Sequence, residues 1–116
     1  MSDCIFCKIV SGEISKSFAY QDNNFLAFDD IHPKAPTHVL VITKKHIPTI
    51  NDASPEDEAL LGKYILAARE VAVRTGIAQD GYRLIVNCGK NGGQMVNHLH
   101  MHVLGGRKMG SKGEEL

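Results

Sequence analysis

The stretch His98-Leu99-His100-Met101-His102-Val103-Leu104 is the most informative part of this sequence of 116 residues. Histidine alternates there with a large apolar residue at three successive positions. Because successive side chains of a β-strand point to opposite faces, the pattern predicts a strand with three imidazoles on one face, about 6.6 Å apart. Leu99, Met101 and Val103 are then expected to face a core. A tag or a solvated face would not alternate with large apolar residues in this way, so we expect a histidine-lined site on a sheet.

A row of imidazoles on one strand face suits three kinds of chemistry. Two imidazoles at positions i and i+2 can hold a metal ion. A neutral imidazole can act as a nucleophile towards phosphorus or carbon, while its neighbours orient it and stabilise charge. A histidine row can also sense pH, because the pKa of histidine lies near neutrality. The residues by themselves leave these three possibilities open.

The sequence before the histidine stretch predicts an α+β fold. Ser54 can cap a helix, Pro55 suits its first position, and apolar residues recur at helical spacing as far as Gly76, where the helix is expected to end. The apolar stretch 5–10 predicts a short N-terminal helix. Strands are expected at 17–21, 25–29, 37–43, 82–87 and 96–104. Their short connections favour a five-stranded antiparallel meander sheet.

Composition limits the classes of partner. Thirteen Lys and Arg balance thirteen Asp and Glu, so the formal net charge is zero. Non-specific nucleic-acid binding rests on excess positive charge, and no nucleic-acid partner is therefore expected. No apolar run approaches the roughly 20 residues of a membrane span, and the N-terminus lacks a signal-peptide pattern. Three cysteines, an odd number, fit a reducing compartment, so we expect a cytoplasmic protein with no membrane partner.

The length predicts a single domain. We expect this domain to occupy residues 1–106. The remaining residues, 107–116, contain glycine and charged side chains with little to bury, so they predict a flexible C-terminal tail.

Several blocks outside the histidine stretch extend the pattern. Together they resemble the histidine triad (HIT) superfamily, in its branch of histidine triad nucleotide-binding proteins, from Cys4 to Gly106. The blocks are Phe28-Asp29-Asp30-Ile31, Ala35-Pro36-Thr37-His38-Val39-Leu40-Val41-Ile42, Lys44-Lys45-His46-Ile47, Gly81-Tyr82-Arg83 and Gly92-Gly93-Gln94. The resemblance implies a HIT-like fold.

The resemblance also implies an activity. Members of this branch are purine nucleoside phosphoramidate hydrolases (phosphoramidases), which cleave the P–N bond of AMP- or GMP-linked amines. The family pattern makes His100 the nucleophile that forms a covalent nucleotidyl-histidine, with His102 and His38 as accompanying imidazoles. Covalent catalysis divides one hard displacement into two easier ones, and imidazole is largely neutral near pH 7. A purine nucleotide is then the expected ligand, and a homodimer the expected assembly.

The family pattern assigns further residues to the nucleotide. Asp30 would accept hydrogen bonds from the ribose hydroxyls, and Asn87 with the turn that contains Gly93 and Gln94 would line the phosphate. An apolar slot for the purine is expected from Phe28, Ile31, Ile5, Phe6, Ile9 and Leu40. Met95 departs from the pattern, because close relatives carry Ser or another polar residue near the leaving nitrogen. Methionine cannot pass a proton, so we expect a lower rate or a shifted amine preference.

The sequence Cys4-Ile5-Phe6-Cys7 forms a second candidate site. A Cys-x-x-Cys motif alone is compatible with a metal site, a redox pair or chance. In some histidine triad proteins the pair binds zinc together with the histidine after Lys-Lys and the first histidine of the triad, here His46 and His98. Two cysteines and two histidines make a closed, structural zinc set. Other relatives lack the cysteines and fold without metal.

Three other functions stay open at this point. The chain could be a nucleotide-binding regulatory module with weak catalysis, which Met95 favours. It could be a zinc-dependent hydrolase with an open metal site in the triad itself. It could also be a dinucleoside polyphosphate hydrolase, from another branch of the superfamily.

Overall fold

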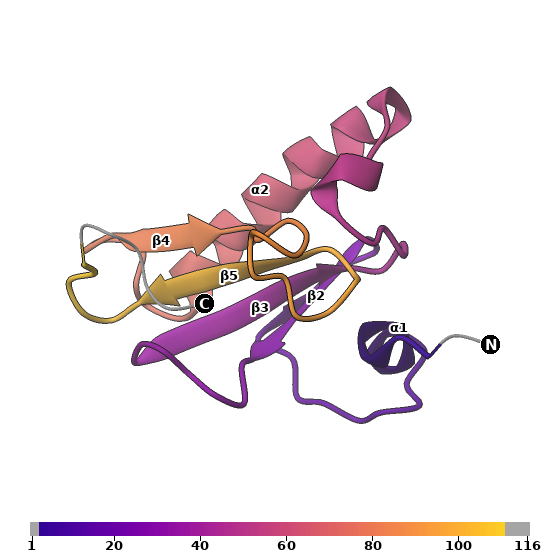
Figure 1. Ribbon diagram of the computed structural model, residues 1–116. Coiled ribbons are helices and arrows are strands. Elements are labelled where there is room, and N and C mark those ends of the chain that lie inside the picture. The colour runs from indigo at the N-terminus through magenta and orange to yellow at the C-terminus, as the bar shows by residue number, and fades with distance from the viewer. Residues whose placement is uncertain (1–2, 111–116) are drawn as a thin grey trace.

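A five-stranded antiparallel sheet forms the centre of the molecule (Figure 1). The computed structural model describes residues 3–110. Its elements are, in chain order, α1 Ile5–Val10, β1 Tyr20–Gln21, β2 Phe25–Asp29, β3 Thr37–Thr43, the 3-10 turns η1 Ile50–Asp52 and η2 Pro55–Asp57, α2 Glu58–Arg74, β4 Tyr82–Ile85 and β5 His100–Gly105. The expected α+β fold, with one long helix and one short N-terminal helix, is confirmed.

The strand order is β1-β2-β3-β5-β4. A meander holds for the first three strands, but the expectation of a meander throughout is wrong, because β5 lies between β3 and β4. The physical reason is the connection through α2. A helical crossover returns the chain in the direction of β3, so β4 runs parallel to β3, and antiparallel β5 pairs with both of them.

The strand limits differ from the expected ones mainly around the histidines. β2 and β3 match the predicted ranges, whereas β1 and β4 are shorter and β5 begins only at His100. His98 therefore lies outside the strand, in a bend closed by a hydrogen bond from its own N–H to the carbonyl of Val96, 2.9 Å. The next N–H, of Leu99, donates to the carbonyl of Ile47, 2.7 Å. The expectation of three imidazoles on one strand is thus wrong for His98, because its backbone bonds to loops.

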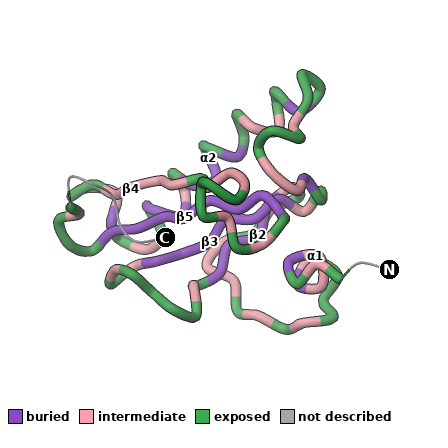
Figure 2. Tube along the Cα trace, in the orientation of Figure 1, coloured by how far each residue is buried: buried purple, intermediate pink, exposed green. Residues whose placement is uncertain are grey.

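The two faces of the sheet carry two separate cores. Alternation along β3 sends Val39 and Val41 to the face of α2, and Leu40 and Ile42 to the face of α1. Figure 2 shows that β5 is buried along its length and β3 over all but its first residue, whereas α2 alternates between buried and exposed residues. Tyr64 of α2 donates its hydroxyl to the Val41 carbonyl at 2.7 Å and so fixes the helix on the sheet. The candidate site therefore lies on the face of the sheet that carries α1.

Helix α2 begins later than expected. Ser54 precedes the 3-10 turn η2, and the α-helix starts at Glu58. The expected end is confirmed, since Thr75 caps the helix and Gly76 has φ +80°, a left-handed conformation that glycine adopts easily. None of the helices within residues 3–110 is long and apolar enough to span a membrane.

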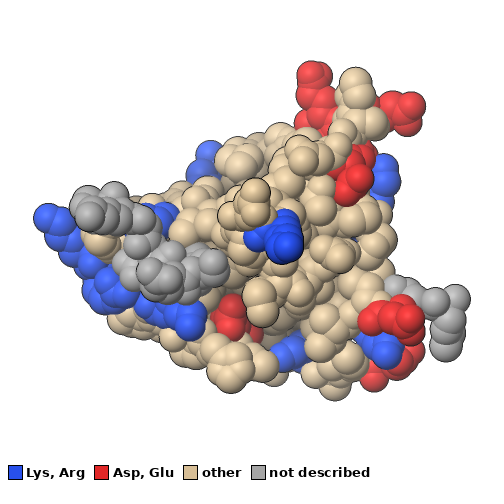
Figure 3. All heavy atoms as spheres, viewed as in Figure 1, with Lys and Arg blue, Asp and Glu red and all other residues tan. Residues whose placement is uncertain are grey.

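Charged side chains do not cover the visible face uniformly. Figure 3 shows Lys and Arg gathered mostly at one end of this face and Asp and Glu mostly at the other. Of the expected C-terminal tail, residues 107–110 are described, and Arg83 donates to the Gly110 carbonyl. The rest of that tail, 111–116, lies outside the described residues.

Candidate active site and metal site

His100 and His102 lie on β5, on the face of the sheet that carries α1. Their cross-strand partners on β3 are Ile42 and Leu40, which belong to the core under α1. His38 shares this face because it precedes Leu40 by two residues on β3. The expectation that the strand of His38 neighbours the histidine strand is met by the pairing of β3 with β5. All three imidazoles are buried.

The tautomer of His100 follows from its surroundings. Its Nδ1 lies 2.7 Å from the carbonyl oxygen of His98, which can only accept a hydrogen bond. Nδ1 therefore carries the proton, and Nε2 of the neutral ring has a lone pair. Among the described residues Nε2 has no hydrogen-bond partner. The ring is thus held by one nitrogen and presents the other as a base or nucleophile.

A chain of hydrogen bonds orients His102. The backbone N–H of Lys34 donates to Nδ1 of His38 at 3.0 Å, so the proton of neutral His38 must sit on Nε2. That N–H donates to Nδ1 of His102 at 2.9 Å. His102 therefore carries its own proton on Nε2, the nitrogen left for a ligand. His100 and His102 thus present opposite roles, one an acceptor and the other a donor.

Asp30 stands beside this chain. Its Oδ2 lies 3.4 Å from Nε2 of His38, and its Oδ1 accepts the backbone N–H of His32 at 2.8 Å. Burial lowers the pKa of His38, although the Asp30 carboxylate acts against that change. Burial likewise lowers the pKa of His100, and it lowers the pKa of His102 to about 4. The imidazoles on this face are therefore neutral near pH 7.

The residues expected to form a purine slot divide into two groups. Phe6, Ile9, Phe28 and Leu40 are buried and form one core cluster next to the imidazoles. The Phe6 ring stands edge-on to the Phe28 ring and to the His100 ring, with centroid distances of 5.8 and 5.2 Å. Ile5 and Ile31 are exposed, 48% and 74%, and belong to neither core cluster. The structure therefore brings four of the six expected apolar residues together on the face that carries His100.

The loop between β4 and β5 contains the residues expected at the phosphate. Asn87 donates its amide to the Gly92 carbonyl at 2.7 Å, and Gly92 cannot carry a side chain because a Cβ there would collide with the backbone of Cys88. Gly93 follows with φ +76°. These contacts close a tight glycine turn whose backbone N–H groups can approach an anion.

The side chain of Gln94 forms hydrogen bonds with backbone groups. Its amide donates to the carbonyls of Pro48 and Val96, at 2.7 and 2.8 Å, and its oxygen accepts the Gly89 N–H at 2.9 Å. Both donors and the carbonyl oxygen are thereby occupied by backbone groups, two in the β4–β5 loop and one at Pro48. Gln94 holds the loop in place and is not available for a phosphate in this conformation. Met95, the next residue, is 89% exposed.

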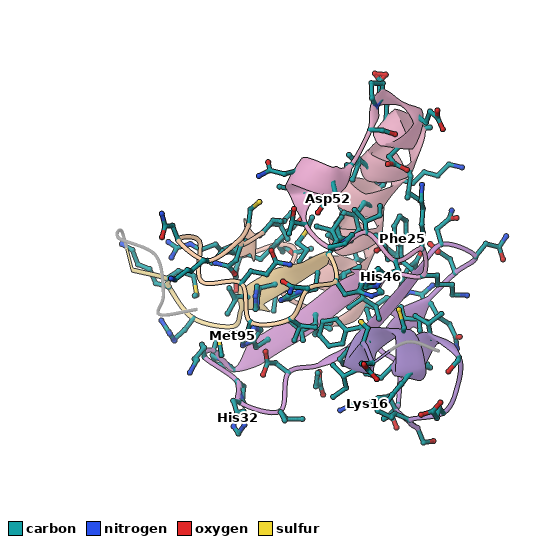
Figure 4. The ribbon with its side chains drawn as sticks, turned by 45° about the vertical axis from the view of Figure 1, so that its right-hand side comes forward. Lys16, Phe25, His32, His46, Asp52 and Met95 are labelled. Carbon is teal, nitrogen blue, oxygen red and sulfur yellow. The ribbon has the colours of Figure 1, made fainter. Side chains whose placement is uncertain are left out.

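The four side chains that the family resemblance implies as zinc ligands converge: Cys4, Cys7, His46 and His98 (Figure 4 labels His46). Cys4 Sγ lies 3.3 Å from Nδ1 of His98, Cys7 Sγ lies 3.2 Å from Nδ1 of His46, and the two Nδ1 atoms are 3.1 Å apart. Tetrahedral zinc with nitrogen at about 2.0 Å and sulfur at about 2.3 Å places neighbouring ligand atoms about 3.3 to 3.8 Å apart. The donor set fits a zinc ion after small adjustments.

The second nitrogen of His98 supports this fit. Nε2 lies 2.6 Å from the Thr43 carbonyl and must donate to it, which leaves the Nδ1 lone pair directed at the two sulfur atoms and His46. Metal-bound histidines usually donate their other N–H to a carbonyl or carboxylate in this way. The cluster is thus a candidate closed metal site with four protein ligands. A second group, Asp30, His38 and His102, is also close enough for a metal, but both nitrogens of His38 are already engaged in hydrogen bonds.

The fold and the two clusters define a class of protein: an α+β domain with a buried row of neutral imidazoles beside an apolar cluster. The comparisons agree. The family model "HIT domain" matches residues 11–109, and the chain belongs to this family. The chain is 52% identical to the purine nucleoside phosphoramidase of Escherichia coli (strain K12) over 93% of this chain and 91% of the relative. It is 45% identical to the protein HitA of Neisseria gonorrhoeae over 90% and 97% of the two chains.

Solved structures give the same result. A HIT family hydrolase from Legionella pneumophila Philadelphia 1 superimposes with a TM-score of 0.91 at 49% identity, covering 94% of this chain and 97% of that one. A histidine triad protein from Clostridium difficile also gives 0.91, at 41% identity and 96% coverage of both chains. The resemblance to the HIT superfamily is therefore confirmed, and with it the HIT-like fold.

Some contributors to the site were missed by the sequence analysis. The carbonyls of Thr43 and His98 and the N–H of Lys34 set the tautomers of three imidazoles. Every residue carries such backbone groups, so no side-chain pattern indicates them. The role of Gln94 was missed for a different reason, because its direction depends on the loop that it closes.

Proposed function

We propose that this protein is a hydrolase that cleaves the P–N bond of purine nucleoside phosphoramidates, releasing an amine and AMP or GMP. The observation that carries the proposal is the bond from Nδ1 of His100 to the His98 carbonyl, which leaves the Nε2 lone pair available. The similarity to the E. coli protein named purine nucleoside phosphoramidase supports the same substrate class.

The proposed reaction has two steps. In the first, Nε2 of His100 attacks the α-phosphorus, the P–N bond breaks, and the leaving amine takes a proton from solvent water, to which the second step returns one. His100 then carries a phosphoryl group on Nε2 and its proton on Nδ1, and the His98 carbonyl stabilises the resulting positive ring. In the second step water attacks phosphorus, the bond to Nε2 breaks, and the water supplies the hydroxyl of the nucleotide and the proton that balances the first step.

The other residues take roles that suit their contacts. Nε2–H of His102 faces outwards from its bond with His38 and can donate to a phosphate oxygen. Asp30 can accept the ribose hydroxyls, and the cluster with Phe6 and Phe28 can pack on the purine. Asn87 and Gly93 shape the turn that would approach the phosphate, whereas Gln94 acts through its backbone contacts.

We also propose that Cys4, Cys7, His46 and His98 bind zinc. A zinc ion would supply structural cross-linking there, tying α1 to the sheet through four protein ligands. No ligand position would be left for water, so the proposed hydrolysis does not use this ion as its Lewis acid. His100 and His102 remain outside the ligand set.

Homodimer formation is a further part of the proposal. α2 has exposed apolar side chains at Ile65, Leu66 and Val73, 51%, 52% and 55%. An apolar helix face of this kind favours burial against a second surface. The single domain over 1–106 and a cytoplasmic location stay predictions.

The test uses a fluorogenic adenosine phosphoramidate with wild type, His100→Ala and the exposed control His32→Gln. Turnover should be lost in His100→Ala and kept in His32→Gln. Quenching wild type during turnover should trap a nucleotide on the protein, and peptide mapping should locate it at His100. Equal turnover in wild type and His100→Ala would refute this mechanism. Tight AMP binding without turnover in any form would favour the regulatory nucleotide-binding module, which the exposed Met95 makes the second candidate.

A further inference from the structure

His98 belongs to both candidate sites at once. Its side-chain Nδ1 lies among the candidate metal ligands, 3.3 Å from Cys4 Sγ and 3.1 Å from Nδ1 of His46. Its backbone carbonyl lies 2.7 Å from Nδ1 of His100. One residue therefore joins the four-ligand cluster to the atom that sets the tautomer and direction of His100.

Phe6 provides a second link between the two sites. It lies between Cys4 and Cys7 in α1, so anchoring the two sulfur atoms also places the Phe6 ring. That ring stands edge-on to the His98 ring at 5.8 Å and to the His100 ring at 5.2 Å. It is buried, 6% exposed, and packs directly beside the candidate nucleophile. Movement of α1 would thus change the packing around His100 on the side of the apolar slot.

The four ligand atoms are arranged so that one cation would satisfy all of them. The bond of Nε2 to Thr43 leaves His98 with a bare lone pair at Nδ1, and Nδ1 of His46 faces it at 3.1 Å. Two lone pairs at that distance repel each other, so either a proton or a metal ion must lie between them. A metal ion would satisfy both nitrogens and both sulfur atoms together, whereas a proton satisfies only one pair of atoms.

We propose that metal binding at Cys4, Cys7, His46 and His98 holds His100 in its reactive orientation, which makes His98 a positioning residue for the reaction. This inference rests on the proposed function. It assigns the metal an effect on catalysis without contact with substrate, through the His98 carbonyl and the Phe6 ring. Displacing a positioned group by about 1 Å can lower a rate about a hundredfold, so the effect is large enough to measure.

The sharpest test compares His46→Ala with His46→Cys. His46 is exposed and lies outside both core clusters, so neither change removes core packing. Cysteine can still ligate zinc, in the Cys3His set known for structural sites, and alanine cannot. The pair therefore changes metal binding at one surface position while the His98 side chain, the sheet and the slot keep their sequence.

Three quantities are measured on the full chain: zinc per protein by elemental analysis, kcat and KM with the adenosine phosphoramidate, and the Nδ1–H signal of His100 by ¹⁵N-resolved NMR. We expect His46→Ala to lose zinc, to lower kcat about tenfold or more with KM changed less than about threefold, and to broaden or shift the His100 signal. We expect His46→Cys to keep zinc and to restore both kcat and the NMR signal.

The outcomes separate this inference from the proposed function. Zinc-free His46→Ala with the kcat and His100 signal of wild type would overturn it, and so would wild-type protein that binds no zinc. If wild type hydrolyses no phosphoramidate, the proposed function fails, and the NMR signal and zinc content alone decide whether the metal orients His100. A merely structural metal would lower thermal stability in His46→Ala but leave kcat and the His100 signal unchanged at a temperature where the protein is folded.

Discussion

Replacing Gln94 by Glu should destabilise the loop that closes the candidate site. The substitution keeps the shape of the side chain and its acceptor for the Gly89 N–H. It removes the two donors that reach the carbonyls of Pro48 and Val96 at 2.7 and 2.8 Å. Each lost bond is worth about 1 kcal/mol, and the introduced carboxylate also faces two carbonyl oxygens. We expect the free energy of unfolding at pH 7 to fall by about 2–4 kcal/mol.

The pH dependence of stability provides a second, independent test of this prediction. Two neighbouring carbonyls raise the pKa of the introduced carboxyl above the usual glutamate value of about 4.3. Because the pKa is raised in the folded state, the free energy of unfolding of the variant is closest to that of wild type at pH values below the pKa of the unfolded chain. It loses stability as the pH rises through the folded pKa, by about 1.4 kcal/mol for each unit of the shift.

The assay is urea unfolding at pH 7 and pH 5, with Gln21→Glu as the matched control. Gln21 is exposed on β1, so the same change of charge there should alter stability by less than about 0.5 kcal/mol. With an m-value of about 1–2 kcal/mol per M, Gln94→Glu should lower the midpoint by about 1–4 M at pH 7. Equal midpoints for the two variants at pH 7, or a difference between them that does not shrink at pH 5, would refute the reasoning.

Three further predictions concern other parts of the molecule. The pKa of His102 is lowered to about 4 in the folded state from a usual 6.5, so the unfolded chain binds more protons than the folded chain between these pH values. The free energy of unfolding should therefore fall as the pH drops from about 6.5 to 4, by about 3 kcal/mol from this residue. Urea unfolding measures this change, and a free energy of unfolding that stays constant across that range would contradict the prediction. Gly105→Ala should lower stability in thermal unfolding by about 1–3 kcal/mol, because the new Cβ would lie 2.7 Å from Cδ1 of Ile77. Adding Ile77→Val removes that atom and should recover part of the lost stability. Additive effects of the two substitutions in the double mutant would exclude the collision as the cause. Met95→Ser should raise phosphoramidase turnover, since a hydroxyl can pass a proton near the leaving amine, and an unchanged or lower rate would count against that explanation.

The strands that pack on both faces could be predicted well from the sequence. β2 and β3 match the expected ranges, and the alternation in β5 does place Met101 and Val103 in the core of α2 and His100 and His102 on the other face. Side-chain alternation is a local property of an extended backbone. It is therefore readable from neighbouring residues alone.

The position of β5 between β3 and β4 was not predictable by the same means. β5 can pair with β3 because the chain crosses over through α2 between β3 and β4. This pairing brings together residues that are far apart in the chain. The same limit applied to Gln94, which looked like a phosphate contact beside two glycines. Its bond to Pro48 spans 46 residues and turns the side chain into the loop.

By itself the sequence determined which residue types are present for chemistry: an alternating histidine row, a Cys-x-x-Cys pair and a glycine turn. The tertiary structure alone decided which nitrogen of His38, His98 and His100 carries the proton, because the deciding partners are backbone groups, those of Lys34, Thr43 and His98. It also took His98 out of the strand and placed it between the candidate metal ligands and His100, the proposed nucleophile. Backbone groups are the same in every residue, so only the folded geometry can say which of them meets which ring.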